Sequence, residues 1–310
     1  MLNFKNTTFF LGIIACLACT KKQAETNTEM TTLVDKGNGI YSIQTGNLTF
    51  EVDAKTGARV SAFKLNGKDF LSGKNVNPDN WGSTFWSSPQ SAWGWPPSGE
   101  IDKLEYSGGI VGGSVVLTSK KDPKLGYVIQ KQFTANAQDT SITIRYTITN
   151  NSDSTRSVSH WEITRVAPGG LTFFPTGKGN KTGKLVPLVK DSIGITWFLY
   201  DSTLIPAENA KLMSDGAEGW MAQINDDIIH IKKWDDVALE KNAPGEGEFE
   251  IYANPDKSYI EIEPQGPYTK LAPGKSASWE VKWYLRPLPE GMKVEVGSGK
   301  LVEWVRGLVK

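Results

Sequence analysis

The residues best suited to act on a substrate are two glutamates, Glu261 and Glu263, in the segment Tyr259–Leu285. Two strand-like runs in this segment flank a turn that contains proline and glycine. Side chains alternate between the faces of an extended strand, so Ile260 and Ile262 share one face and the glutamates share the other. The glutamate Cα atoms would be about 6.5–7 Å apart, so both carboxylates could contact one small substrate. The alternative is a half-buried strand whose glutamates point into water.

A histidine, His160, is the second candidate, in the strand-like run Ser157–Arg165. Alternation places His160 on the same face as Glu162, and Arg165, a candidate for substrate binding, on the opposite face. Because the pKa of histidine lies near neutral pH, His160 could act as a general acid. A single histidine in a strand is more commonly a hydrogen-bonded core or surface group, and His230 has only that interpretation.

Four tryptophans lie close together in the segment Asn80–Glu100, which is rich in serine, proline and glycine and therefore typical of a loop. Loops run over the surface, and a loop cannot easily bury four indoles. An indole face can stack on the apolar face of a sugar ring. We expect Trp93 and Trp95 to be exposed at the rim of a pocket, with Gln90 as a polar contact. The first two tryptophans of the segment have the alternative role of fixing the loop to the core.

The N-terminus predicts export. Phe9–Leu17 is an apolar run of signal-peptide length, too short to span a bilayer. The cysteine that follows resembles a bacterial lipoprotein cleavage box, so we expect a signal peptide at residues 1–18, a lipidated Cys19 and a flexible tether at residues 19–36. Cys16 is a second candidate for lipidation, and an ordinary secretory signal is the alternative. The protein is thus predicted to be lipid-anchored in the bacterial cell envelope, periplasmic or at the cell surface, with this anchor as its only membrane contact.

The composition argues against several classes of function. The 310 residues include 34 basic and 34 acidic ones, so no basic surface indicates a nucleic-acid partner. Both cysteines lie in the targeting region and only two histidines are present, so we expect no disulfide, no metal site built from cysteine or histidine and no cofactor. Asp226–Asp227 and Asp235–Asp236 could offer oxygen ligands to calcium, and the alternative is that both pairs are turn residues. Eleven tryptophans in a chain of balanced charge suit a neutral ligand such as a sugar or glycan, although tryptophan also fills large cores.

The rest of the chain predicts one large all-β sandwich over residues 37–310. Short alternating segments rich in threonine, valine, isoleucine and aromatic residues follow one another between turn residues, without a linker that would separate two domains. A helical repeat appears only at Gly299–Val309, which predicts a short C-terminal helix. The predicted strands are Leu48–Val52, Arg59–Leu65, Gly113–Thr118, Tyr127–Thr134, Ser141–Thr149, Ser157–Val166, Ile193–Tyr200, Ile228–Lys233 and Ser278–Leu285.

In order along the chain, these features resemble the aldose 1-epimerases, or galactose mutarotases. Ala58–Gly67 resembles their early hairpin with an arginine and a Leu-Asn-Gly turn, and Ile144–His160 resembles their strand, polar turn and histidine. Ile262–Gln265 and Leu271–Gly274 resemble their late Glu-x-Gln and Leu-x-Pro-Gly elements. The tryptophan block Trp86–Pro97 is similar to one found in uncharacterised lipoproteins of this superfamily. The resemblance implies a β-supersandwich with a sugar-binding concave face.

The resemblance also implies a mechanism that interconverts sugar anomers. Glu263 would be the base that removes the anomeric proton, and His160 the acid that protonates the ring oxygen. Glu261 would raise the pKa of Glu263 by like-charge proximity. The second active-site histidine of many mutarotases is absent here, so Gln90 or Trp93 would replace that contact. The alternative function is a non-catalytic glycan-binding lipoprotein that uses the tryptophan-rich loop.

Overall fold

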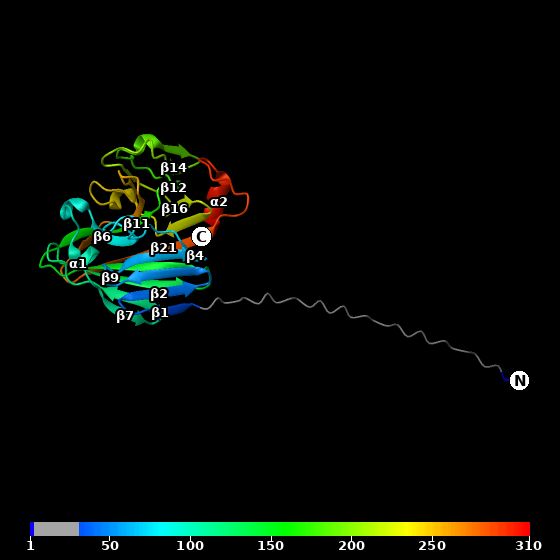
Figure 1. Cartoon of the computed structure of the whole chain (residues 1–310), viewed down its shortest axis with the longest axis horizontal. Helices are drawn as coiled ribbons and strands as arrows, with labels where there is room; N and C mark the ends of the chain where they lie inside the picture. The colour runs from blue at the N-terminus through cyan, green and yellow to red at the C-terminus, as the bar shows by residue number, and fades with distance from the viewer. Residues whose placement is uncertain (3–30) are drawn as a thin grey trace.

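The computed structural model describes residues 1–2 and 31–310. From Thr32 onward the chain forms two large antiparallel sheets packed face to face (Figure 1). The first sheet runs in the order β1 (Thr32–Asp35), β2 (Ile40–Thr45), β3 (Leu48–Asp53), β4 (Arg59–Leu65), β6 (Ser83–Ser88), β11 (Arg156–Val166), β19 (Ile260–Pro264), β18 (Phe249–Ala253) and β15 (Lys211–Ser214), with β5 (Lys68–Asp69) beside β4 and β20 (Thr269–Leu271) beside β11. The second runs in the order β13 (Val189–Ser192), β14 (Ile195–Leu199), β12 (Leu171–Pro175), β16 (Trp220–Asn225), β17 (Ile228–Lys233), β21 (Ser276–Pro287), β10 (Ser141–Asn150), β9 (Tyr127–Asn136), β8 (Ser114–Thr118) and β7 (Ser107–Val111).

This architecture confirms the predicted all-β sandwich with a short terminal helix. The helix α2 (Gly299–Leu308) covers a secondary apolar cluster on the second sheet, and a four-residue helix, α1 (Gly99–Asp102), lies beside β6. The strands predicted at Arg59–Leu65 and Ile228–Lys233 coincide with β4 and β17. No helix of the described residues is long and apolar enough to cross a membrane.

Two predictions of local structure differ from the observed fold. The start of the tryptophan block belongs to strand β6 rather than to a loop. All six residues of β6 are buried, because both faces of the first sheet are covered at this strand. Strand β1 pairs with β2 and lies inside the predicted tether 19–36, so regular structure begins before the predicted boundary at residue 37. The signal peptide and the lipidation of Cys19 fall outside the described residues and stay predictions.

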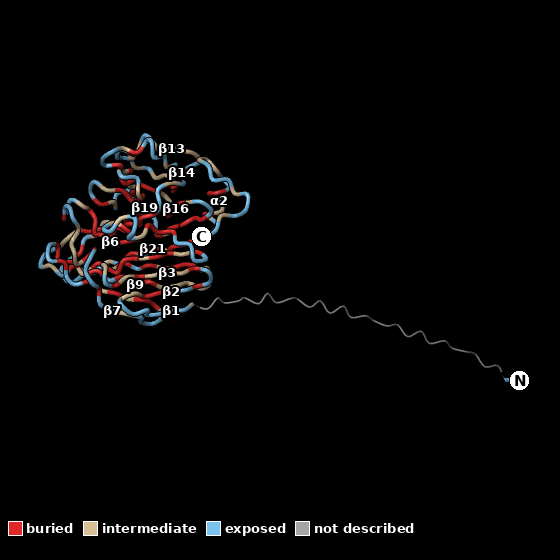
Figure 2. Tube along the Cα trace, in the orientation of Figure 1, coloured by how far each residue is buried: buried red, intermediate tan, exposed pale blue. Residues whose placement is uncertain are grey.

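The core lies between the two sheets, where buried residues form a continuous layer and the connecting segments are exposed (Figure 2). Aromatic side chains from both sheets meet there. Phe50 on β3 contacts Phe133 on β9 at 5.7 Å between ring centroids and Trp283 on β21 at 5.9 Å. Such offset and edge contacts add to the free energy gained by burying apolar surface.

One buried ion pair joins the two sheets. Lys232 Nζ on β17 lies 2.8 Å from Glu162 Oε1 on β11, and both side chains are fully buried. Glu162 also accepts hydrogen bonds from Tyr146 and Trp283, and Lys232 also donates to Thr164 and to the carbonyl of Ile262. Because every polar group of a buried pair needs a partner, this network fixes which side of β11 faces the core.

We predict that Lys232→Met destabilises the protein by about 3–5 kcal/mol, because it leaves the Glu162 carboxylate buried without its counter-charge. The double variant Glu162→Leu/Lys232→Met should regain much of this loss. Urea unfolding followed by tryptophan fluorescence measures both. Lys68→Met, at an exposed ion pair, is the matched control and should change little. A loss for Lys232→Met no larger than that of the control would contradict a structural role for the buried pair.

Candidate functional site

A polar pocket lies on the face of the first sheet that points away from the core. It encloses about 920 Å³ of space that includes open solvent, and its floor is formed by neighbouring strands of the sheet from β6 to β15. We call it the polar pocket throughout. Its lining residues are Asn80, Trp86, Gln90, Trp95, Trp161, Asn209, Lys211, Tyr252, Asn254, Tyr259, Glu261 and Glu263.

Glu263 is the most deeply placed carboxyl group of the polar pocket, with 1% of its surface exposed. Its Oε2 accepts a hydrogen bond of 2.7 Å from the Trp161 indole, whereas Oε1 is buried and has no protein partner. A buried polar atom without a partner costs free energy, and such atoms are uncommon in native structures. The free oxygen is therefore the first group of this pocket that a ligand could satisfy.

A second carboxyl group, Glu250 on β18, lies opposite Glu263 in the register of the two strands. Burial raises the pKa of Glu250 to about 7, although Lys211 Nζ is only 2.6 Å away and opposes the shift. Burial, with the charges of Glu250 and Glu261, raises the pKa of Glu263 well above its usual value. The charge of Glu250 thus opposes ionisation of Glu263, so near neutral pH we assign at most one negative charge to the pair, balanced by Lys211.

Glu261 is held in a different way, two residues away on the same strand face. Its Oε1 accepts a hydrogen bond of 2.7 Å from Arg165 Nε, so it carries a charge with its counter-ion at hand. Arg165 also lies over the Trp86 ring, 5.5 Å from its centroid, and its two terminal nitrogens have no protein partner. Arg165 does not line the polar pocket, and it acts on the pocket by orienting Glu261.

The aromatic residues of the tryptophan block divide between core and pocket. Trp95 is exposed over 64% of its surface and lines the polar pocket, together with Gln90, as predicted for both. Its ring meets Trp86 edge to face at 5.7 Å. Trp93, which we expected to be exposed, has 6% of its surface accessible and donates its indole N–H to the Ser87 carbonyl at 2.7 Å. The prediction that Trp93 is exposed at a pocket rim is therefore wrong, whereas its contact with substrate stays a prediction.

His160 lies on the opposite face of β11 from the polar pocket. It is buried between the sheets, against the rings of Phe85 and Trp279, and its Nε2 is 3.2 Å from the carbonyl oxygen of Ala277. Burial lowers its pKa to about 4, so the ring is neutral at working pH. The predicted pairing of His160 with Glu263 is not formed, because adjacent residues of β11 point to opposite faces. The interpretation of His160 as a core histidine fits the structure.

The residues that the sequence interpretation missed are Trp161, Lys211 and Glu250. Trp161 follows His160 in the chain and shares the strand face of Arg165, yet the pocket was expected on the face of His160. Lys211 and Glu250 reach the site through pairing between β15, β18 and β19, which no local pattern reveals. The only available signal was alternation in Phe249–Ala253, which leaves one glutamate among apolar residues.

One protein-family model matches most of the chain. The model of the family described as "Domain of unknown function (DUF4380)" matches residues 95–286. No curated protein gives a significant match.

Solved structures with the same fold are numerous. A galactose mutarotase-like protein from Lactobacillus casei ATCC 334 is 13% identical, with 80% of this chain and 100% of that chain covered and a TM-score of 0.53. One from Clostridium acetobutylicum is 12% identical, with 84% and 99% covered and a TM-score of 0.52. A TPR-domain containing protein from Parabacteroides distasonis ATCC 8503 is 14% identical, with 83% and 49% covered and a TM-score of 0.56. At these identities the similarity shows the fold alone.

We predict that the protein loses stability as pH rises from 5 to 8, because the carboxyl groups of Glu250 and Glu263 are buried. Because the folded pKa values of Glu250 and Glu263 are raised, their contribution is fully present below about 4.5, and that of Glu250 is lost as pH rises through about 7. The rise in the pKa of Glu250 to about 7 corresponds to a loss of up to about 3 kcal/mol in the free energy of unfolding. Urea unfolding at several pH values should show a smaller loss for Glu263→Gln than for the unchanged protein. Exposed Glu290→Gln is the control, and equal slopes for the two variants would contradict the assignment.

Proposed function

This chain belongs to the DUF4380 family and has the galactose mutarotase-like fold, and we propose that its polar pocket binds a neutral sugar. The observation that carries the proposal is the unpartnered Oε1 of Glu263 in a pocket that also contains the exposed ring of Trp95. A sugar offers what both groups lack, hydroxyls for the carboxyl oxygen and an apolar ring face for the indole.

The charges around the pocket favour a neutral ligand over an ionic one. Lys211 is balanced by the Glu250–Glu263 pair, and Arg165 is balanced by Glu261. An anionic ligand would meet the carboxyl groups of Glu261 and Glu263, and a cationic one would meet the ammonium group of Lys211, whose charge is already paired. Neither would find an uncompensated charge, so electrostatics gives neither an advantage.

Polar but uncharged groups complete the recognition surface. The amides of Gln90, Asn209 and Asn254 and the phenol of Tyr252 line the same pocket. Each amide both donates and accepts hydrogen bonds, which matches the hydroxyls of a sugar. The combination of one exposed indole with several amides is suited to orienting a small polyhydroxylated ring.

We predict that Trp95→Ala weakens sugar binding by about tenfold or more, because it removes the apolar platform of the pocket. Isothermal titration calorimetry with a panel of free aldoses and methyl glycosides, supported by a glycan array, measures the effect. Trp304→Ala in α2 is the matched control because Trp304 does not line the polar pocket. Binding that survives Trp95→Ala unchanged, or no binding by any sugar in the panel, would refute the proposal.

A second candidate function is the interconversion of sugar anomers, and the different states of two carboxyl groups favour it. Glu263, whose pKa is raised, would serve as the neutral acid, and Glu261, paired with Arg165, would serve as the carboxylate base. Two carboxyls that differ in this way are a common source of acid and base in one site. The roles are altered from the sequence interpretation, in which Glu263 was the base and His160 the acid.

The proposed reaction needs only proton transfers. Glu261 takes the proton of the anomeric hydroxyl while Glu263 donates its proton to the ring oxygen, and the bond from C1 to the ring oxygen breaks. Rotation about the C1–C2 bond and the reverse transfers then close the ring as the other anomer. Both carboxyls regain their starting states, and no other reactant is consumed.

We predict that the protein accelerates the mutarotation of an aldose that it binds and that Glu263→Gln lowers the rate by at least about a hundredfold. Polarimetry or one-dimensional NMR of freshly dissolved sugar measures this. Because glutamine preserves shape, sugar affinity should remain within a few-fold. Glu290→Gln should leave the rate unchanged. Tight sugar binding without faster mutarotation would exclude the enzymatic function and leave sugar binding as the function of the pocket.

A further inference from the structure

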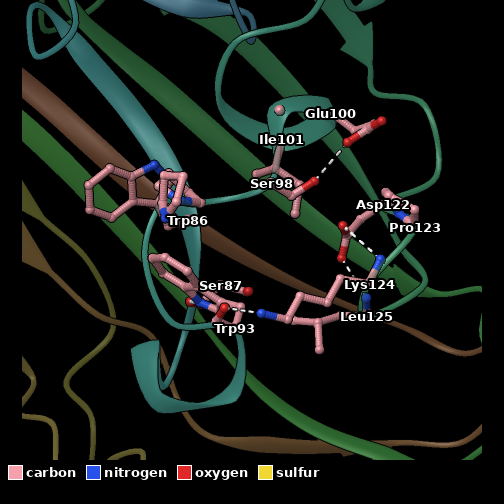
Figure 3. A pocket seen from close by; sticks show the side chains of 13 residues that line it. Trp86, Ser87, Trp93, Ser98, Glu100, Ile101, Asp122, Pro123, Lys124 and Leu125 are labelled. Carbon is pink, nitrogen blue, oxygen red and sulfur yellow. Dashed lines mark hydrogen bonds between the residues drawn. The ribbon is translucent and has the colours of Figure 1, made fainter.

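A second hollow, between the tryptophan block and the loop before β9, shares the lining residue Trp86 with the polar pocket (Figure 3). It encloses about 620 Å³ of space that includes open solvent. Its apolar lining residues are Trp86, Trp93, Pro96, Pro97, Ile101, Pro123 and Leu125. We call it the apolar pocket.

The polar side chains at the apolar pocket are already engaged by the protein. Ser98 donates to Glu100 at 2.9 Å, and the Asp122 carboxylate accepts from the backbone N–H groups of Lys124 and Leu125 (Figure 3). The Lys124 ammonium donates to the carbonyl of Trp93. These bonds leave mostly carbon surface for a ligand, in contrast to the free Glu263 oxygen of the polar pocket.

The indole N–H groups of the apolar pocket are engaged as well. Trp93 donates to the Ser87 carbonyl, and Trp86 donates to Asp102 at 2.9 Å. A sugar ring placed here would lose hydrogen bonds to water without replacement, at a cost in free energy for each hydroxyl. An aromatic ring has no such hydroxyls and gains from contact with indole and proline surfaces.

The two pockets share one wall. Trp86 lines both of them, and its ring centroid lies 5.8 Å from that of Trp93, which lines the apolar pocket, and 5.7 Å from that of Trp95, which lines the polar pocket. Trp95 lines the polar pocket, and the next two residues, Pro96 and Pro97, line the apolar one. One ligand with a polar and an apolar half would therefore meet both surfaces in succession.

We propose that the apolar pocket binds an aromatic ring, the aglycone of a glycoside whose sugar occupies the polar pocket. The aromatic site stands on its own observations, and its link to a glycoside rests on the proposed sugar-binding function. The ligand class is thus an aryl glycoside rather than a free sugar or a chain of several sugars.

The experiment uses anisole, which has the aryl ether of a phenyl glycoside, together with matched phenyl and methyl glycosides of the aldoses in the panel. Saturation-transfer NMR on the purified protein should show anisole binding. Anisole binding should be lost in Pro97→Asp and Pro123→Asp, because each places a carboxylate at the apolar pocket. Pro97 is partly exposed and Pro123 is exposed, so neither change buries a charge in the core. Pro289→Asp, outside both pockets, and Trp95→Ala should retain it. Phenyl glycosides should bind at least about tenfold more tightly than methyl glycosides.

Each outcome separates the aromatic site from the sugar site. Absence of anisole binding, or binding that persists in both Asp variants, overturns the inference even if sugars bind. Anisole binding that both Asp variants remove, without binding of any glycoside, supports the aromatic site and refutes the sugar-binding function. Equal affinities for phenyl and methyl glycosides overturn the link between the two pockets. Circular dichroism checks that the Asp variants are folded. If only one of them folds, that variant alone decides whether anisole binds at the apolar pocket.

Discussion

The buried ion pair between Glu162 and Lys232 determines which residues reach the polar pocket. It joins β11 in one sheet to β17 in the other, and it is satisfied only while Glu162 points into the core. Because side chains alternate along a strand, this orientation turns His160 inward and Trp161 and Arg165 outward. A shift of one residue in β11 would exchange the two faces, bury an unpaired Arg165 and expose the core histidine. The pair is therefore a constraint on orientation as well as a contribution to stability.

The chemistry of the polar pocket follows from the neighbours that the outward face brings together. Trp161 bonds to Glu263, Arg165 bonds to Glu261, and the next strand adds Glu250 with its partner Lys211. Two glutamates that look equivalent in the sequence are thus in unlike surroundings. One is buried beside another carboxyl and holds its proton to higher pH, and the other is paired with a guanidinium. This asymmetry makes acid–base chemistry possible without a histidine.

Local pattern was sufficient for much of this arrangement. Alternation placed Glu261 and Glu263 on one face, and Glu162 with His160 on the opposite face from Arg165, as the structure has them. It could not show which face of β11 is covered by the second sheet, since that depends on Lys232, which is distant in the chain. For the same reason Glu250 and Lys211 were invisible. The segment Asn80–Glu100 misled because its composition is that of a loop, whereas pairing with β4 and β11 makes Ser83–Ser88 a buried central strand.

The indole N–H signals of the tryptophans offer the most direct test of whether a sugar binds beside Glu263. In ¹H–¹⁵N NMR spectra recorded during titration with an aldose or glycoside that binds, the Trp161 and Trp95 indole signals should shift. The Trp161 indole donates a hydrogen bond to Glu263, and Trp95 lines the polar pocket. Those of Trp197 and Trp220, buried in the second sheet, should stay in place. A sugar that binds without moving the Trp161 signal would contradict a site at the Glu263 carboxyl.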